Sequence, residues 1–176
     1  MKSITKWQIA GFIFTGIAGV LLHFLFDWSG GSIFVAPFSA VNESIWEHMK
    51  LLFFPMLVFA IVESRYGNKN FWCVKRLGIV LGTLLIPVFY YVINGAFGET
   101  PDWVNIAVFF ITAVISYIVE NYLFKKDALI CKSSQGALVT LWIVAFVFVL
   151  FTFAPPKIPL FQDPATGGYG FRVKGI

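Results

Sequence analysis

Residues 136–154 read GALVTLWIVAFVFVLFTFA and contain no ionisable side chain. At about 1.5 Å of rise per residue, an α-helix over this stretch is about 28 Å long, close to the roughly 30 Å hydrocarbon core of a bilayer. Pro155-Pro156 follows directly and would end such a helix. The stretch is therefore predicted to cross a membrane.

Four further apolar runs of similar length precede it, near residues 7–28, 41–63, 71–94 and 103–123. Hydrophobic residues make up 59% of the chain and charged residues only 12%, whereas soluble domains contain roughly 25% charged residues. The sequence predicts an all-α, polytopic bundle of about five transmembrane helices, which forms one domain over residues 1–154 in contact with the lipid bilayer. Basic residues do not alternate with aromatic ones as they do in nucleic-acid-binding proteins, so nucleic acid is not expected as a partner.

Lysine and arginine gather at the amino terminus and around the second and fourth loops, as Lys2, Lys6, Arg65, Lys69, Lys75, Arg76, Lys125, Lys126 and Lys132. The first and third loops hold none, although the carboxyl tail contains Lys157, Arg172 and Lys174. Because cytoplasmic loops carry an excess of these residues, the amino terminus is predicted to be cytoplasmic and the tail extracytoplasmic. Cys73 and Cys131 then lie at the cytoplasmic side, where free thiols are expected.

Two ionisable residues, His23 and Asp27, lie four positions apart near the outer end of the first run and share one helix face. The second run opens with residues 42–50, NESIWEHMK, in which Glu43 and Glu47 are predicted to share one face and Ser44 and His48 an adjacent one. A charged group inside a bilayer costs on the order of 2.5–3.5 kcal/mol at mid-membrane. These groups therefore require a partner, a metal ion or a wet cavity.

Two interpretations of this cluster are possible. In the first, His23, Asp27, Glu47 and His48 bind a divalent transition metal such as zinc, and Glu43 activates water as a general base. Supporting residues would be Asn42, Ser44 and Lys50. Lesser candidates, which either line the same cavity or, as we prefer, anchor the helices at the interface, are Tyr90, Tyr91, Asn94, Glu99, Asp102 and Asn105. In the second, the same groups form a polar network between helices, and Lys50 neutralises the acids while extending towards the outer interface. The spacing matches no established metal motif. Glu63 and Glu120, near the cytoplasmic side, are interpreted as boundary residues that pair or face water.

The tail over residues 155–176 is too polar to span and too weakly charged to be a simply solvated extension. Asp163-Pro164 favours a turn, and Gly167, Gly168 and Gly170 permit unusual backbone angles. We expect an ordered tail that folds over the outer mouth of the bundle, with Asp163 or Tyr169 facing inward. A disordered tail is the alternative.

Three segments resemble the hallmarks of an uncharacterised family of small bacterial integral-membrane proteins. They are the HxxxDW pattern at residues 23–28, VNESIWEHMKLLFFP at 41–55 and DPATGGYG at 163–170. The resemblance implies a multi-pass protein of the bacterial plasma membrane and marks these positions as functional. It supplies no reaction.

Three functions are compatible with these observations. The first is a metal-dependent hydrolase or transferase that acts on a lipid or lipid-linked substrate near the outer leaflet. The second is a non-catalytic binding or transport protein for a cation or small polar solute, completed by a second copy or a partner subunit. The third is a structural or regulatory membrane subunit.

Overall fold

Five α-helices account for most of this computed structural model, which describes residues 2–98, 100–126 and 131–171. Their bounds are α1 Lys2–Trp28, α2 Ile45–Glu63, α3 Phe71–Phe97, α4 Asp102–Lys126 and α5 Ser134–Phe153, with short 3-10 helices η1 at Ser64–Tyr66 and η2 at Pro159–Phe161. Each of the five is long and apolar enough to cross a membrane. The predicted all-α fold with five candidate spans is confirmed.

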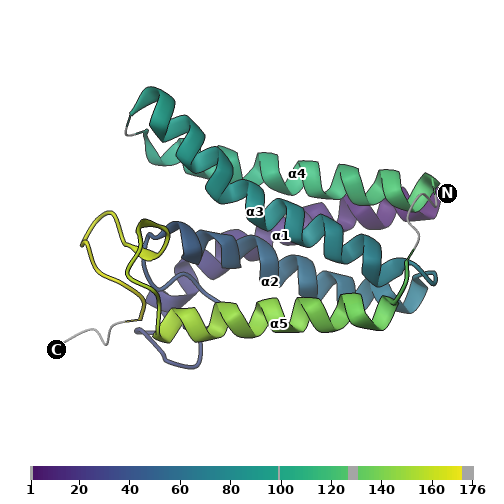
Figure 1. Ribbon diagram of the computed structural model, residues 1–176, viewed down its shortest axis with the longest axis horizontal. Coiled ribbons are helices and arrows are strands. Elements are labelled where there is room, and N and C mark those ends of the chain that lie inside the picture. Colours follow the sequence, from purple (N-terminus) through teal and green to yellow (C-terminus); the bar gives the residue numbers. More distant parts are fainter. Residues whose placement is uncertain (1, 99, 127–130, 172–176) are drawn as a thin grey trace.

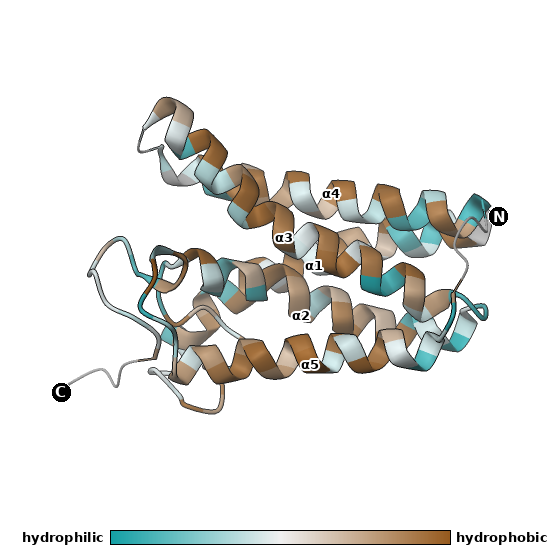
Figure 2. Cartoon of the chain, in the orientation of Figure 1, coloured by the Kyte–Doolittle hydropathy of each residue, from teal (hydrophilic) through white to brown (hydrophobic). Residues whose placement is uncertain are grey.

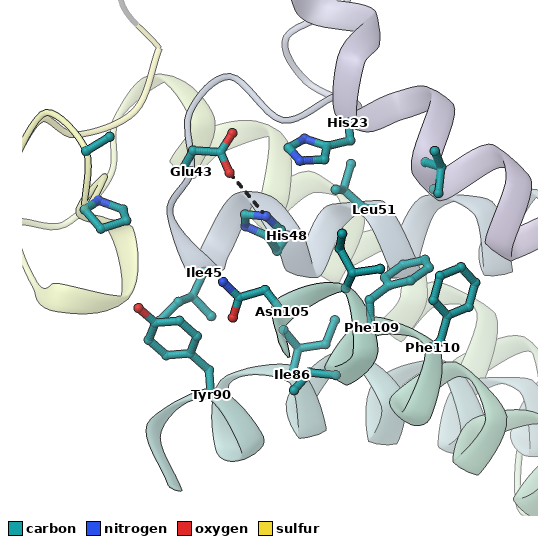
Figure 3. A pocket seen from close by; sticks show the side chains of 16 residues that line it. His23, Glu43, Ile45, His48, Leu51, Ile86, Tyr90, Asn105, Phe109 and Phe110 are labelled. Carbon is teal, nitrogen blue, oxygen red and sulfur yellow. Dashed lines mark ion pairs between the residues drawn. The ribbon is translucent and has the colours of Figure 1, made fainter. Parts of the chain in front are cut away.

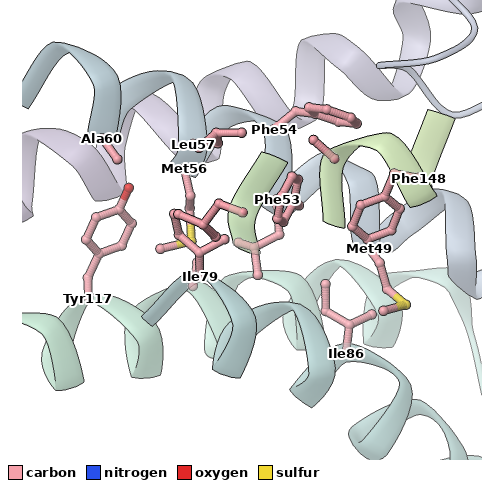
Figure 4. Close-up of a cluster of buried hydrophobic side chains, with 14 of the residues drawn as sticks. Met49, Phe53, Phe54, Met56, Leu57, Ala60, Ile79, Ile86, Tyr117 and Phe148 are labelled. Carbon is pink, nitrogen blue, oxygen red and sulfur yellow. The ribbon is translucent and has the colours of Figure 1, made fainter. Parts of the chain in front are cut away.

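Helix α2 lies in the middle of the bundle and packs against α1, α3 and α5 (Figure 1). In the most apolar 18-residue stretch of each span, 78% of α2 is buried, compared with 28% of α1. Helix α2 therefore supplies much of the core. Phe53 and Met56 of α2 pack there with Ile79 of α3 and Phe148 of α5 (Figure 4). The other helices expose apolar side chains along their lengths, while polar residues gather at the ends of the bundle (Figure 2). A bilayer is the environment that such a surface requires.

The start of α2 differs from the prediction, because the helix begins at Ile45 rather than near residue 41. Ser44 is the N-cap, and its hydroxyl accepts a hydrogen bond from the Glu47 amide at 3.4 Å. The Asn42 side-chain oxygen accepts from the Ser44 amide at 2.9 Å. Glu43 therefore precedes the helix, and the prediction that Glu43 and Glu47 share a helix face is wrong.

The connection over residues 29–44 folds back onto the end of α1. The Ser39 hydroxyl accepts from the Phe26 amide at 3.0 Å and donates to the Leu22 carbonyl oxygen. These two backbone groups are four residues apart on α1, so the hydroxyl binds the donor and the acceptor of the same helical turn. Ala36 and Ser39 are fully buried. The connection is thus fixed against the helical turn that carries His23.

A disulfide joins Cys73, in the first turn of α3, to Cys131, just before α5. The expectation of free thiols is contradicted. Helices α3 and α5 are neighbours that start at the same end of the bundle, and this brings the two Cα atoms to 5.9 Å despite a sequence separation of 58. The proximity is tertiary, and nothing in the local sequence indicates it.

The far end of the α3–α4 pair leans away from the rest of the bundle (Figure 1). Pro87 lies within α3 on the way to that end, and a proline in a helix removes one backbone hydrogen bond and favours a bend. The divergence separates this end of α3 and α4 from the start of α2 and from the carboxyl tail. A cavity opens between them.

Candidate functional site

The cavity has a volume of about 460 Å³ and is lined by α1, α2, α3, α4 and the tail. Its polar side chains lie towards the end of the bundle, and its apolar wall includes Phe109 and Phe110 of α4 (Figure 3). Val20 of α1 also lines it. Tyr90 and Asn105, both expected as lesser candidates, line it as well. The site is therefore amphipathic.

Three side chains converge at the polar side of the cavity: His23 from α1, Glu43 from the segment before α2, and His48 from α2 (Figure 3). One potential ligand atom from each lies within 4.8 Å of the others, and the two imidazole centroids are 5.4 Å apart. His48 Nε2 lies 3.5 Å from Glu43 Oε2. Among the described residues, this is the group of metal-ligating side chains that is close enough to hold one ion.

The orientation of His48 is set by its own helix. Its Nδ1 lies 2.9 Å from the Ser44 carbonyl oxygen, which can only accept, so Nδ1 carries the hydrogen. Nε2 then faces the Glu43 carboxylate, and two electron-rich atoms in that arrangement require a proton or a metal ion between them. His23 Nδ1 is also buried and has no hydrogen-bond partner among the described residues. His23 Nδ1 is therefore available as a ligand beside the His48–Glu43 pair.

The spacing suits a small metal ion. In a tetrahedral zinc site with bonds of about 2.1 Å, neighbouring ligand atoms lie about 3.4 Å apart. The His48–Glu43 distance is already 3.5 Å. The ligand atoms lie within 4.8 Å of one another, so the group would close on a zinc ion with about 1.4 Å of side-chain movement. Glu43 is exposed and begins outside helix α2, so its side chain has the freedom to move.

Glu47 belongs to a different cluster on the buried side of α2. Its Oε2 lies 2.6 Å from Lys50 Nζ, and it also accepts from the Val41 amide at 3.0 Å. Lys50 Nζ donates in addition to the Ala36 carbonyl at 3.0 Å and to the Thr152 hydroxyl at 2.8 Å. Both ionic side chains are at most 1% exposed. Lys50 therefore points into the protein, and the expectation that it extends to the interface is wrong.

The proposed metal ligands are thus only partly brought together. His23 and His48 meet each other and Glu43, whereas the Glu47 carboxylate is bound by Lys50 and the Val41 amide. Asp27, one turn beyond His23 on α1, is not part of the three-residue group. The carboxylate that joins the two histidines is therefore that of Glu43, in place of Asp27 and Glu47.

The described part of the tail, residues 155–171, reaches the cavity; residues 172–176 lie outside the described part. Asp163 does not line the cavity: its carboxylate accepts from the Ala165 amide at 3.1 Å and from the Thr166 hydroxyl at 2.6 Å, which fixes the turn. The next two residues, Pro164 and Ala165, line the cavity instead. Tyr169 pairs with Gln162 across the base of this loop.

Asn42 connects the tail to the start of α2. Its side-chain amide donates to the Gly170 carbonyl at 3.2 Å, while the Phe171 amide donates to the Thr152 carbonyl at 2.7 Å. Gly170 has a φ of 60°, and a Cβ there would lie 2.7 Å from the Thr152 carbonyl oxygen, so only glycine fits. Asn42 and Ser44 therefore support the site by holding backbone, the former in the tail and the latter at the N-cap.

The apolar wall was not identified from the sequence. Phe109 and Phe110 belong to an apolar span in which every such residue reads as core or lipid-facing. One signal was present: Asn105 and Phe109 are four residues apart, so a cavity that contains the first includes the second on the same helix face.

Comparison with known proteins adds a family. A search of curated proteins and a search of solved structures each found no match. A family model described as "Family of unknown function (DUF6512)" matches residues 1–171, nearly the whole chain. The matched residues include all five helices and the tail through residue 171. This five-helix membrane protein belongs to the family of unknown function DUF6512.

Proposed function

We propose that this protein is a membrane-embedded, metal-dependent hydrolase or transferase that acts on a lipid or lipid-linked substrate. The observation that carries the proposal is the convergence of His23, Glu43 and His48 on an amphipathic cavity at one end of the bundle. Two imidazoles and one carboxylate are a ligand set used by catalytic zinc, which keeps its fourth position for water or substrate. Bound zinc would supply a hydroxide nucleophile at neutral pH and polarise a substrate oxygen.

In this scheme Glu43 is a metal ligand rather than the general base. Its carboxylate is the one that reaches the histidines, and the hydrogen bond from His48 to the Ser44 carbonyl is the outer-shell contact that metal-binding histidines ordinarily make. Asn105 and Tyr90 are then the polar groups placed to orient a substrate.

A lipid substrate is favoured by how the cavity meets the membrane. Val20 of α1 and Ile106 of α4 both line the cavity, yet they are 45% and 56% exposed on the apolar surface of the bundle. The cavity therefore opens sideways towards the acyl chains. A lipid could place its head group at the histidines and its chain against Phe109 and Phe110.

The position of the site within the cell follows from the basic residues. Their concentration at the opposite end of the bundle favours a cytoplasmic amino terminus and an extracytoplasmic cavity covered by the tail. The sequence resemblance described above points to the bacterial plasma membrane. Residues 155–171 would then act as an outer cover rather than as a separate domain.

Metal analysis of the purified protein tests the ligand set. We expect close to one equivalent of a divalent transition metal, and a loss of at least tenfold in metal affinity in His48→Ala and Glu43→Gln. Asp27→Asn is the matched control, because it removes a carboxylate predicted from sequence that lies outside the three-residue group. Retained metal in Glu43→Gln, together with lost metal in Asp27→Asn, would overturn the assignment.

Activity is tested by incubating the metal-loaded protein with a total bacterial lipid extract and comparing lipid masses before and after. Wild-type protein should consume or modify a lipid, and His48→Ala should not. If wild-type protein binds metal stoichiometrically but changes no lipid, the enzymatic proposal fails and a cation-binding role takes its place.

A further inference from the structure

A second buried polar cluster lies at the opposite end of the bundle from the cavity. Four helices contribute to it: α1 supplies Gln8, α2 supplies Glu63, α3 supplies Lys75 and α4 supplies Glu120. Glu63 is the last residue of α2, so the cluster lies close to the aqueous phase on that side. None of the four is more than 8% exposed.

A single ammonium group binds two carboxylates in this cluster. Lys75 Nζ lies 2.5 Å from Glu63 Oε2 and 2.6 Å from Glu120 Oε2. Gln8 donates to the other oxygen of Glu63 at 2.9 Å. The rings of Phe71, Tyr117 and Phe124 surround the ammonium group at 5.6–5.8 Å.

The charges of the cluster do not balance if both acids are ionised. Two carboxylates and one ammonium group have a net charge of −1. A net charge that is buried in a membrane protein and not compensated is strongly unfavourable. Tyr117, a further titratable group of the described residues whose ring faces Lys75, shares its hydroxyl with Thr15 at 2.8 Å. One more positive charge is needed.

The hydrogen-bond inventory gives the same result. Glu120 Oε1 and Gln8 Oε1 are buried acceptors with no partner among the described residues. Buried acceptors of this kind are ordinarily satisfied. The cluster is thus short of a donor as well as of a positive charge.

On the side of Glu120 that faces α3, the packing leaves no space for a ligand. Gly78 of α3 packs directly against this side chain, and a Cβ added at Gly78 would overlap the Glu120 carboxylate. A space too small for a methyl group on that side holds neither a water molecule nor a hydrated metal ion. A proton occupies no such volume.

We propose that Glu63, Lys75 and Glu120 form a proton-binding site, in which one carboxyl group is protonated and the cluster is neutral. A proton on Glu63 would be donated to Gln8 Oε1 after a half-turn of the amide, which also satisfies that orphan acceptor. Exchange occurs with the aqueous phase next to the end of α2. This site is independent of the metal group at the other end.

Infrared spectroscopy of the purified protein tests the proposal directly. At neutral pH we expect a carbonyl band of a protonated carboxylic acid that is absent, or clearly weaker, in Glu63→Gln or Glu120→Gln. Glu43→Gln, which removes an exposed carboxylate, should leave the band unchanged. The proposal is overturned if wild-type protein shows no such band, or if the band persists in both cluster variants.

Thermal stability provides a second test that does not depend on the spectrum. An amide has the shape and charge of a protonated carboxyl group, so at least one of Glu63→Gln and Glu120→Gln should unfold within about 4 °C of wild type. Lys75→Met should lower the midpoint by much more. If both glutamine variants are as unstable as Lys75→Met, or fail to fold, both acids must be ionised and the site holds no proton.

Discussion

Replacement of Lys50 by methionine should strongly destabilise the protein while leaving the metal group intact. The ammonium group makes three contacts, to Glu47 of its own helix, to the Ala36 carbonyl in the 29–44 connection, and to the Thr152 hydroxyl of α5. Methionine fills a similar volume but supplies no donor. The substitution therefore removes the links between three segments at once.

The magnitude follows from burial and distance. At 2.6 Å, and with an effective dielectric constant of about 20, the attraction between Lys50 and Glu47 is about 6 kcal/mol before desolvation is subtracted. Removing one partner of a buried pair costs about 3–5 kcal/mol, because the other charge is left behind or must take up a proton. We expect Lys50→Met to lower the free energy of unfolding by that amount.

A double-mutant cycle separates the ion pair from the packing. Glu47→Gln/Lys50→Met contains no stranded charge, and the glutamine oxygen can still accept from the Val41 amide. The double variant should recover at least about 2 kcal/mol relative to Lys50→Met alone. Unfolding in mixed micelles, followed by circular dichroism as the fraction of denaturing detergent is raised, provides the free energies.

Two results would refute this reasoning. A loss of less than about 1 kcal/mol in Lys50→Met would mean that the pair is solvated rather than buried. A double variant no more stable than the single one would mean that packing, not charge, dominates. Metal content of the folded Lys50→Met protein should equal that of wild type, and its loss would connect Glu47 and Lys50 to the metal group after all.

Three further predictions concern the helix contacts, the disulfide and the metal. Gly82→Ala should cost about 1–3 kcal/mol because its Cβ would overlap the Ser116 hydroxyl, whereas Gly95→Ala, which meets open space on the same helix, should cost nothing in the same unfolding assay. Cys73→Ser should lower stability by about 4 kcal/mol, as the chain-entropy model gives for a loop closed across 58 residues, and reduced wild-type protein should match the variant. Metal affinity, followed by titration with cobalt and visible absorption, should fall as the pH is lowered through the range where histidine takes up a proton; a flat profile would exclude histidine ligands.

The five spans could be predicted because hydropathy acts over whole segments. Each helix is long and apolar enough to cross a bilayer, and all but α2 expose much of their apolar surface, so the sequence signal did not depend on tertiary detail. The predicted ends agree with the observed helix ends to within five residues, and the difference that matters for the site is the one at the start of α2. There the pattern Ser44-x-x-Glu47 is a capping signature that places the helix start after Ser44 and leaves Glu43 outside. This pattern therefore predicts that Glu43 precedes the helix and that Glu47 lies within its first turn.

The convergence of His23, Glu43 and His48 was predicted, but the separation of Glu47 into a second cluster was not, because its partners come from other parts of the chain. Glu47 and His48 are adjacent in sequence but lie on different faces, one towards Lys50 and Thr152 and the other towards the cavity. Of the two alternatives expected for Glu63 and Glu120, ion pairing or contact with water, ion pairing is observed: both carboxylates bind Lys75. The shared partner is 45 residues from Glu120 in the sequence. The spacing of residues along a helix predicts which of them share a face, but it does not predict which other helix packs against that face.

The basic residues and the disulfide bear on the orientation of the protein in opposite directions. Lysines and arginines near the disulfide end favour a cytoplasmic location for that end, whereas disulfides persist mainly in oxidising compartments. The two signals act at different times, because loop charges act during insertion and the disulfide requires α3 and α5 to be packed as neighbours. We therefore expect the charges to set the topology, with the cavity facing outward. Acid quenching of intact cells followed by alkylation tests this: a fully oxidised Cys73–Cys131 pair would reverse the orientation and place the histidine cavity on the cytoplasmic side.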